Sequence, residues 1–118
     1  MKPAAVPANV EPYVRVLGID GAIEFLLEFG GAELYLARTP QRRSKLVALV
    51  GEDKATALAA AAERLPKRVP LAKRWIAEVW WAQGLSTAQI ARRLRASDVA
   101  VRGWLKPAKA RAEQLNLF

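Results

Sequence analysis

The sequence predicts a mostly α-helical fold that contains a single short strand. Apolar residues recur at helical spacing in several segments, which begin at capping residues or prolines and end at glycine or proline. Only one stretch, residues 32–37, alternates aliphatic and aromatic residues as a strand does. With 118 residues, the chain has room for one small domain or two very small ones.

The composition favours a binding protein over an enzyme. The chain contains no Cys and no His, so it lacks a thiolate nucleophile, an imidazole base and the usual zinc ligands. Because no phosphate-cradling glycine loop is visible either, we expect no catalytic activity, no metal and no cofactor. The apolar runs are shorter than a membrane span and the first residues do not resemble a signal peptide, so we expect a cytoplasmic protein that does not contact a membrane.

Basic residues concentrate in the C-terminal two-thirds of the chain. Overall, 19 Lys and Arg stand against 11 Asp and Glu. Residues 1–40 carry a balance of −2, whereas residues 41–118 carry +10. Such an asymmetry is typical of a surface that binds nucleic-acid phosphates, although an ordinary solvated surface has the same composition.

The N-terminal half is predicted to contain an arm, three short helices and the strand. Its first residues include three prolines and show no periodicity, which favours a flexible arm. The expected elements are the arm over residues 1–12, helices over residues 20–29, 40–51 and 52–65, and the strand over residues 32–37.

The lone strand predicts a homodimer. Its backbone N–H and C=O groups need partners, and no second strand-like segment is evident in the sequence. Pairing with the same strand of a second copy satisfies these groups most economically. We therefore assign residues 13–66 to a dimerisation region, with Gly30, Gly31, Leu34, Tyr35 and Leu36 in its dimer strand.

Three further helices are expected after a basic, proline-flanked linker over residues 66–70. They cover residues 71–83, 87–94 and 98–106, with Ser86 or Thr87 capping the second and Pro107 ending the third. Residues 108–118 form a charged tail or a helix with an apolar end.

Four tryptophans fall in these three helices. Their helical spacing favours core packing over base stacking for Trp75, Trp80 and Trp104. For Trp81, core packing and base stacking both remain open.

Residues 84–105, GLSTAQIARRLRASDVAVRGWL, resemble a helix-turn-helix DNA-binding motif. Side chains of suitable size fall where the two helices must pack together: Ile90, Ala91, Leu94, Ala96, Val101 and Trp104. The turn position that is usually Gly is Arg95, which costs about 1 kcal/mol if its φ is positive. The predicted fold is thus mostly α, with an N-terminal helical dimerisation region and a C-terminal helix-turn-helix domain over residues 67–107.

The motif implies how the second helix meets DNA, because that helix enters the major groove. Its exposed N-terminal residues are Ser97, Asp98, Val99, Ala100, Arg102 and Gly103, and we assign base contacts to all but the glycine. Arg102 suits guanine O6 and N7, and Val99 or Ala100 suits a thymine methyl, whereas Asp98 more readily caps the helix. Phosphate contacts are expected from Thr87, Arg92, Arg93, Arg95 and Lys106, with an ordinary solvated face as the alternative.

Over residues 20–105 the chain resembles the Mor transcription activator family of Mu-like phages. The resemblance rests on the C-terminal motif and on Gly30-Gly31-Ala32-Glu33-Leu34-Tyr35-Leu36, which fits the pattern GGxxxY followed by an aliphatic residue. It implies an intertwined homodimer that binds a dyad element upstream of a promoter and recruits RNA polymerase. The chain departs from the family at Ala37, where Pro is usual, and in the additional helix over residues 52–65. The leading interpretation is a phage or prophage transcription regulator that binds double-stranded DNA in the nucleoid.

The last five residues suggest a second interpretation. Gln114-Leu115-Asn116-Leu117-Phe118 resembles the pentapeptide by which replication and repair proteins dock on the bacterial sliding clamp. The resemblance implies that Gln114 bonds at the rim while Leu117 and Phe118 fill an apolar pocket, which would make the chain a DNA replication or repair accessory protein. The alternative for these five residues is a helix end that packs on its own domain or on its dimer partner. The alternative for the whole chain is a protein-interaction module that binds no DNA.

Overall fold

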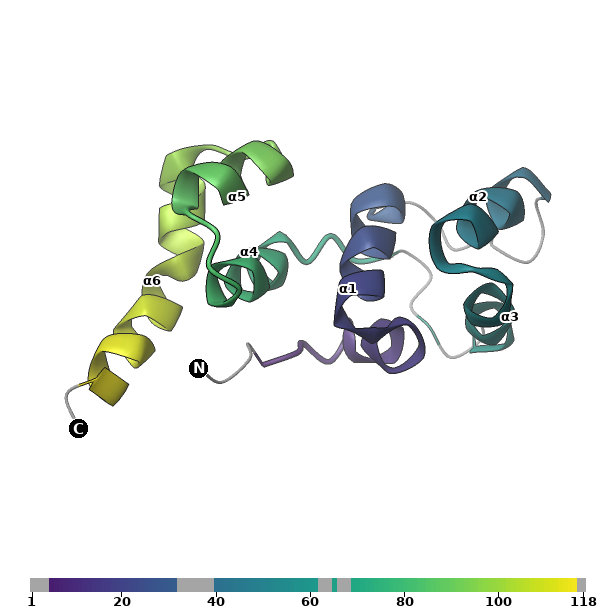
Figure 1. Cartoon of the computed structure of the whole chain (residues 1–118), viewed down its shortest axis with the longest axis horizontal. Helices are drawn as coiled ribbons and strands as arrows, with labels where there is room; N and C mark the ends of the chain where they lie inside the picture. The colour runs from purple at the N-terminus through teal and green to yellow at the C-terminus, as the bar shows by residue number, and fades with distance from the viewer. Residues whose placement is uncertain (1–4, 32–39, 62–64, 66–68, 117–118) are drawn as a thin grey trace. The chain divides into compact units, whose positions relative to one another are not determined.

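The computed structural model describes residues 5–31, 40–61, 65 and 69–116, with the backbone alone for residues 40–44 and 115–116. The described residues form six helices, in order α1 (Glu11–Phe29), α2 (Pro40–Val50), α3 (Glu52–Ala61), α4 (Lys73–Ala82), α5 (Thr87–Leu94) and α6 (Asp98–Asn116) (Figure 1). The mostly α-helical class is therefore confirmed. The described residues include no strand, and the strand predicted over residues 32–37 lies outside them. No described helix is long and apolar enough to cross a lipid bilayer.

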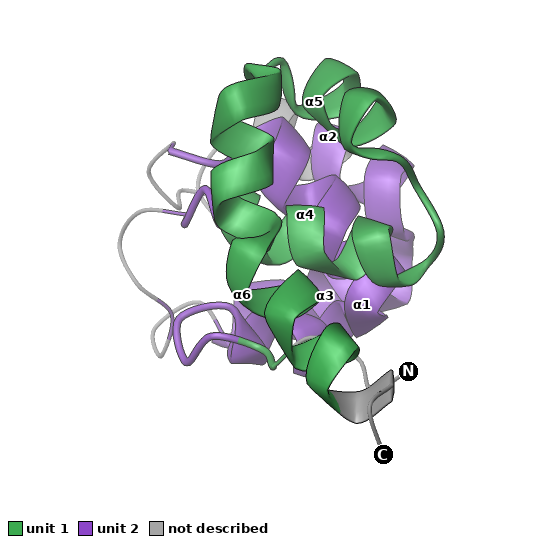
Figure 2. Cartoon of the chain, turned by 90° about the vertical axis from the view of Figure 1, so that its left-hand side faces the viewer, with its two compact units in different colours: residues 1–6, 73–118 green, residues 7–72 purple. Residues whose placement is uncertain are grey.

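The chain divides into two compact units (Figure 2). One unit consists of residues 7–72 and contains α1, α2 and α3. The other consists of residues 73–118 together with residues 1–6, and contains α4, α5 and α6. The boundary between the units falls after residue 72, two residues beyond the linker predicted over residues 66–70. The end of that linker belongs to the first unit, because Val69 is only 2% exposed and lies in its core.

Helix α1 starts inside the segment predicted as an arm. Val10 and Tyr13 are fully buried, and Pro12 lies in the first turn of the helix, where proline is tolerated because its missing N–H has no intrahelical partner. Gly18 interrupts the helix with φ 77° and ψ 171°, a conformation that favours glycine. The helix predicted over residues 20–29 is confirmed as the part beyond this kink.

Aromatic packing and fully buried small and aliphatic side chains hold the first unit together. The Tyr13 and Phe25 rings stack with centroids 5.2 Å apart, which joins the two parts of α1 across the kink. Helices α2 and α3 both pack on α1, with Leu46, Ala55 and Leu58 fully buried. The predicted break between α2 and α3 is confirmed at Gly51, whose φ is 92°.

Helices α4, α5 and α6 pack against one another in the second unit. Each contributes buried side chains at helical spacing, namely Trp75, Ile76, Val79 and Trp80 from α4, Ile90, Ala91 and Leu94 from α5, and Val101, Leu105 and Ala108 from α6. Trp104 and Ala96, which were also predicted to pack, are half-buried. Trp81 is half-buried as well.

The prediction that the last helix ends at Pro107 is wrong. Helix α6 continues through Pro107 to Asn116. A proline inside a helix lacks one N–H donor and crowds the carbonyl of the residue four positions earlier. In α6 that residue is Gly103, which is exposed, so water can hydrate its carbonyl. Leu105 and Ala108 are buried on either side of the proline, so packing favours a continuous helix over a break.

Candidate nucleic-acid interface

The predicted helix-turn-helix segment corresponds to α5, three connecting residues and α6, and a reciprocal cap fixes its start. The Ser86 Oγ accepts a hydrogen bond from the Gln89 N–H at 3.2 Å, and the Gln89 Oε1 accepts one from the Ser86 N–H at 2.9 Å. This capping box identifies Ser86, rather than Thr87, as the N-cap. Such a cap stabilises a helix by about 1 kcal/mol.

The connection between the helices depends on a left-handed residue. Arg95, at the position where Gly is usual, has φ 53° and ψ 43°. Its strain is offset in part because the following Ala96 N–H donates to the Ala91 carbonyl at 2.9 Å. Ser97 then begins α6, with its Oγ accepting a hydrogen bond from the Ala100 N–H at 3.1 Å.

The predicted base-contact residues lie on the first two turns of α6 or just before them. Because Val101, Leu105 and Ala108 face the core, the opposite face is turned to solvent. Its exposed members are Val99, Arg102, Gly103 and Lys106, while Ser97 and Asp98 are exposed at the helix start. Val99 has 71% of its surface exposed. Ala100 is half-buried, so it is less accessible than the sequence analysis assumed.

Asp98 and Arg102 are neighbours one turn apart, and their carboxylate and guanidinium form no ion pair. The Arg102 Nε instead donates to the Asp98 carbonyl oxygen at 3.4 Å, a long hydrogen bond that leaves the terminal nitrogens free. The Asp98 carboxylate lies in the first turn of α6, where a negative charge is favourable. The side chain that caps α6 by a hydrogen bond is that of Ser97, and the capping role predicted for Asp98 stays a prediction.

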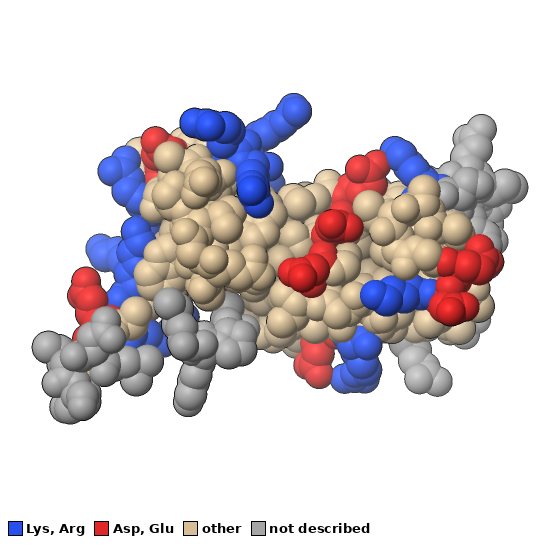
Figure 3. Space-filling view, viewed as in Figure 1, with Lys and Arg blue, Asp and Glu red and all other residues tan. Residues whose placement is uncertain are grey.

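The predicted phosphate-contact cations are exposed and lack carboxylate partners. Within the described part of the chain, ion pairs involve none of Arg92, Arg93, Arg95, Arg102 and Lys106. Thr87 is half-buried beside the cap. In the space-filling view, Lys and Arg side chains gather along the edges formed by α5 and α6 (Figure 3). Residues 73–118 carry nine Lys and Arg against three Asp and Glu, a balance of +6 that leaves these cations available to an anionic ligand.

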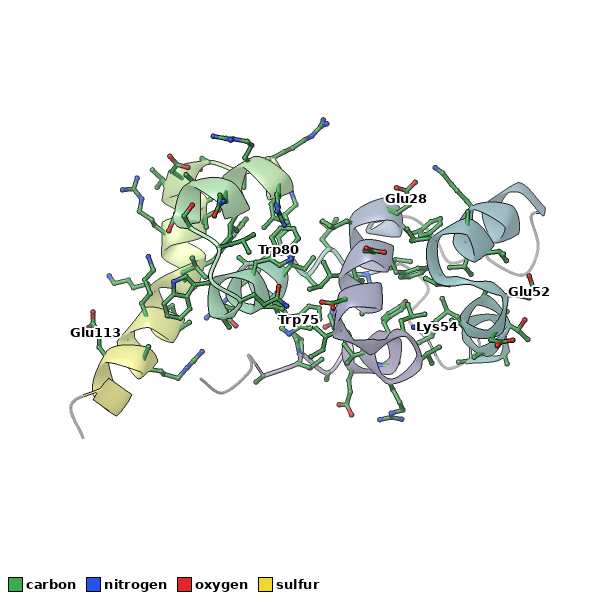
Figure 4. The ribbon with its side chains drawn as sticks, in the orientation of Figure 1. Glu28, Glu52, Lys54, Trp75, Trp80 and Glu113 are labelled. Carbon is green, nitrogen blue, oxygen red and sulfur yellow. The ribbon has the colours of Figure 1, made fainter. Side chains whose placement is uncertain are left out.

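Sequence reasoning missed one contact that orients a cation. The guanidinium carbon of Arg93 lies 5.6 Å from the centre of the Trp80 ring, in the range of a cation–π interaction. Trp80 and Trp75 both project from α4 (Figure 4), and both are largely buried, so their predicted core positions are confirmed. Because the pair joins two helices, no local sequence pattern predicts it.

The longer α6 also adds cations that the sequence analysis did not assign. Lys109 lies one turn beyond Lys106, which itself lies one turn beyond Arg102, so the three share one side of the helix. Arg111 is exposed farther along α6, and Glu113 is labelled near the end of the same helix in Figure 4. Their spacing is visible in the sequence, but it indicates a single face only once the helix is known to pass Pro107.

The predicted dimer strand falls largely outside the described residues. Leu34, Tyr35 and Leu36 lie there, whereas Gly30 and Gly31 follow the end of α1. A Cβ on Gly30 would come within 2.4 Å of the Leu26 carbonyl oxygen. The Gly31 N–H donates to the Val69 carbonyl at 2.7 Å. Close packing within the chain therefore accounts for Gly30, a role that the sequence pattern did not indicate.

Of the predicted clamp-binding residues, Gln114 is exposed in the last described turn of α6 and Leu115 belongs to the same helix. Leu117 and Phe118 lie outside the described residues.

Among the residues that the structure does describe, no group of three or more Asp or Glu side chains could hold a metal ion. No protein-family model, no curated protein and no solved structure matches this chain.

Proposed function

We propose that this protein is a homodimeric regulator of transcription that binds a specific sequence of double-stranded DNA. The observation that carries the proposal is the exposed face of α6, where Arg102 and Lys106 lie beside Val99 and pair with none of the described carboxylates. Three arginines around the α5–α6 connection extend this cationic surface. An α-helix is about 10–12 Å wide with its side chains, which matches the width of about 12 Å of the major groove.

In this proposal the cations divide into two roles. Arg102 projects from the exposed face of α6 toward base edges, where its free terminal nitrogens suit the O6 and N7 acceptors of guanine. Arg92, Arg93 and Arg95 contact phosphates on either side and supply affinity and register rather than sequence preference. Binding then displaces counterions, with log K falling by about 0.9 per phosphate contact for each unit of log salt.

The homodimer and its regulatory output rest on the sequence. Strand pairing around Tyr35 would place two copies of α6 on one duplex, and two-fold symmetry would then require a palindromic site. The resemblance to the Mor family suggests a phage or prophage activator that recruits RNA polymerase in the bacterial cytoplasm. We propose no catalytic activity and no cofactor for it.

Selection from a randomised duplex library at two salt concentrations tests this function, with the oligomeric state recorded by sedimentation. We expect a dimer to enrich a two-fold symmetric site whose half-sites are separated by about one helical turn or a multiple of it. Salt-sensitive binding without enrichment would leave a nonspecific DNA-binding protein. Binding that is absent at both salt concentrations would contradict the proposal and favour a protein-interaction module.

A second candidate function draws on the exposure of Gln114 at the end of α6. In it, residues 114–118 dock on the bacterial sliding clamp and tether the protein to replicating or repaired DNA. Fluorescence polarisation of a peptide covering residues 108–118, titrated with purified clamp, tests this directly. We expect Gln114→Ala to weaken that binding if the peptide docks, and an unbound wild-type peptide would exclude the tether.

A further inference from the structure

We infer that Val99 and Gly103 form an apolar contact surface for thymine methyl groups, with Gly103 as the residue that lets α6 approach the base edges. The inference rests on the proposed DNA-binding function and names the base that this face of α6 selects. It assigns a role to a glycine whose presence the fold itself does not require.

Val99 is the first part of this surface. It is the most exposed of the large apolar side chains in the described part of the chain, at 71%. A single exposed Val is common on protein surfaces and by itself indicates nothing. Here, however, it lies on the face of α6 that carries Arg102, and Gly103 follows it by four residues, so the Val99 and Gly103 positions are neighbours on that face.

Gly103 is the second part of this surface, and neither its backbone conformation nor its packing requires a glycine. It lies inside α6 without a positive φ, so its backbone conformation is open to any residue. A Cβ built on it would meet no atom within 4 Å, so no neighbour in the unit needs the space. Glycine is among the least favourable residues inside a helix, second only to proline, and an alanine here would strengthen α6.

A glycine at this position would allow a ligand to approach the backbone of α6 more closely than any other residue would. The charges around it select an anionic ligand, because Arg102 and Lys106 flank the position and only Asp98 opposes them nearby. Among the groups in the major groove, the C5-methyl of thymine is the apolar one. Val99 offers it a methyl surface, and the missing side chain at position 103 allows the base edge to come close.

One internal explanation competes, since Pro107 crowds the carbonyl of the residue four positions earlier, which is Gly103. Glycine adapts its backbone more readily than other residues, so it could serve to accommodate the proline. The two explanations differ in what Gly103→Ala does to the free protein. If Gly103 accommodates the proline, the variant melts at a lower temperature, whereas if it serves DNA contact, the variant melts at the same or a higher temperature.

The test uses the full chain and a duplex enriched in the selection, prepared once with thymine and once with deoxyuridine, which lacks only the 5-methyl group. We expect wild-type protein to bind the deoxyuridine duplex about fourfold more weakly for each contacted methyl. Val99→Ala should bind both duplexes with similar affinity. Gly103→Ala should melt no lower than wild type but bind the thymine duplex about fivefold more weakly or worse. Ala110→Val, which adds bulk on an exposed part of α6 two turns farther on, serves as the control and should bind as wild type does.

Equal wild-type affinity for the two duplexes would overturn the inference while leaving the proposed DNA binding intact. A lower melting temperature of Gly103→Ala would assign the glycine to Pro107 and overturn its role at the DNA. If Gly103→Ala fails to fold, that result has the same meaning, and the comparison of wild type with Val99→Ala on the two duplexes still decides the methyl contact. A wild-type protein that binds neither duplex would overturn the proposed function itself.

Discussion

The guanidinium carbon of Arg93 lies 5.6 Å from the centre of the Trp80 ring, so a cation of α5 is held against an aromatic face of α4. This contact favours rotamers that keep the Arg93 guanidinium over the ring. A long exposed side chain normally loses conformational entropy when it binds a phosphate, and a side chain that already has such a contact has less entropy left to lose. Arg93 is therefore better organised for a phosphate contact than Arg92, its exposed neighbour.

Replacing Arg93 with Lys tests this organisation, because Lys keeps the charge but lacks the planar guanidinium and its fixed set of donors. A Lys ammonium can still contact the ring, so the loss should be at most the roughly 0.5–1 kcal/mol of the cation–π contact. We expect Arg93→Lys to weaken duplex binding about two- to fivefold, as measured by fluorescence anisotropy at fixed salt. The matched variant Arg92→Lys should lose less, and equal losses would show that Trp80 does not position Arg93.

Arg102 and Lys106 lie one turn apart on the exposed face of α6 and should affect binding in different ways. We expect Arg102→Ala to relax base preference at one position by about 1–3 kcal/mol. Lys106→Ala should weaken binding to all sequences equally and make the salt dependence shallower by about one unit. Affinities for the selected duplex and for random duplexes, measured over a salt series, separate the two effects. The same loss on both duplexes for both variants would contradict the assignment of roles.

Arg95 combines a left-handed backbone with a proposed phosphate contact, so its replacement should change stability and DNA binding in opposite directions. With φ 53° and ψ 43°, the position favours glycine. We expect Arg95→Gly to raise the free energy of unfolding by about 1 kcal/mol and to reduce the salt slope of DNA binding by about one unit. Urea unfolding and a salt series measure the two quantities. Arg95→Ala is the control, since it removes the charge but keeps the Cβ and should gain no stability.

Tyr13 predicts a loss of stability in alkaline solution. Burial raises the pKa of the Tyr13 hydroxyl from 10.0 to about 12, because the phenolate would lose its hydration. Between these two values the unfolded chain releases the proton while the folded chain retains it, so stability falls as the pH rises from about 10 to 12. The expected slope is about 1.4 kcal/mol per pH unit from this group.

Tyr13→Phe is the control for this effect. The Tyr13 hydroxyl is buried without a hydrogen-bond partner, so its removal should cost little or no stability near neutral pH. The difference in unfolding free energy between the two proteins should change only above pH 10. A constant difference from pH 8 to pH 12 would show that Tyr13 ionises in the folded protein as it does in the unfolded chain.

The predicted dimer strand makes a separate prediction at Tyr35. A proline there removes a backbone N–H that strand pairing would use, so Tyr35→Pro should shift the protein from dimer to monomer. Tyr35→Phe keeps the backbone donor and most of the side chain, and it should remain dimeric. Sedimentation velocity at several concentrations distinguishes these states, and a Tyr35→Pro dimer as tight as wild type would place the interface elsewhere.

Local sequence signals predicted much of the helical order. Glycine and proline marked the ends of α2, and the glycine between α2 and α3 has the positive φ that such a break needs. The Ser86 Oγ caps α5 by accepting from the Gln89 N–H, and the Gln89 side chain accepts from the Ser86 N–H, so both contacts join residues three positions apart. These features depend on neighbours within about four residues, which is why they can be predicted without knowing the tertiary structure.

Other features could not be predicted because their cause lies across the unit. Pro107 is a helix breaker by local rules, and α6 passes through it because Leu105 and Ala108 are buried on both sides. The predicted arm over residues 1–12 includes Glu11 and Pro12, which instead begin α1, because Val10 and Tyr13 on either side of them are buried. In each position the packing of one face outweighs the local propensity.

The sequence by itself determined the mostly helical class, the start of α5 at Ser86 or Thr87, the break at Gly51 and the concentration of positive charge in the C-terminal part. These follow from residue type and from contacts that are close along the chain. Only the tertiary structure decided that Trp80 contacts Arg93, that α6 continues past Pro107, and that Gly30 is needed to avoid the Leu26 carbonyl. Exposure and contacts between helices depend on how the faces pack, and that packing joins residues that no local pattern connects.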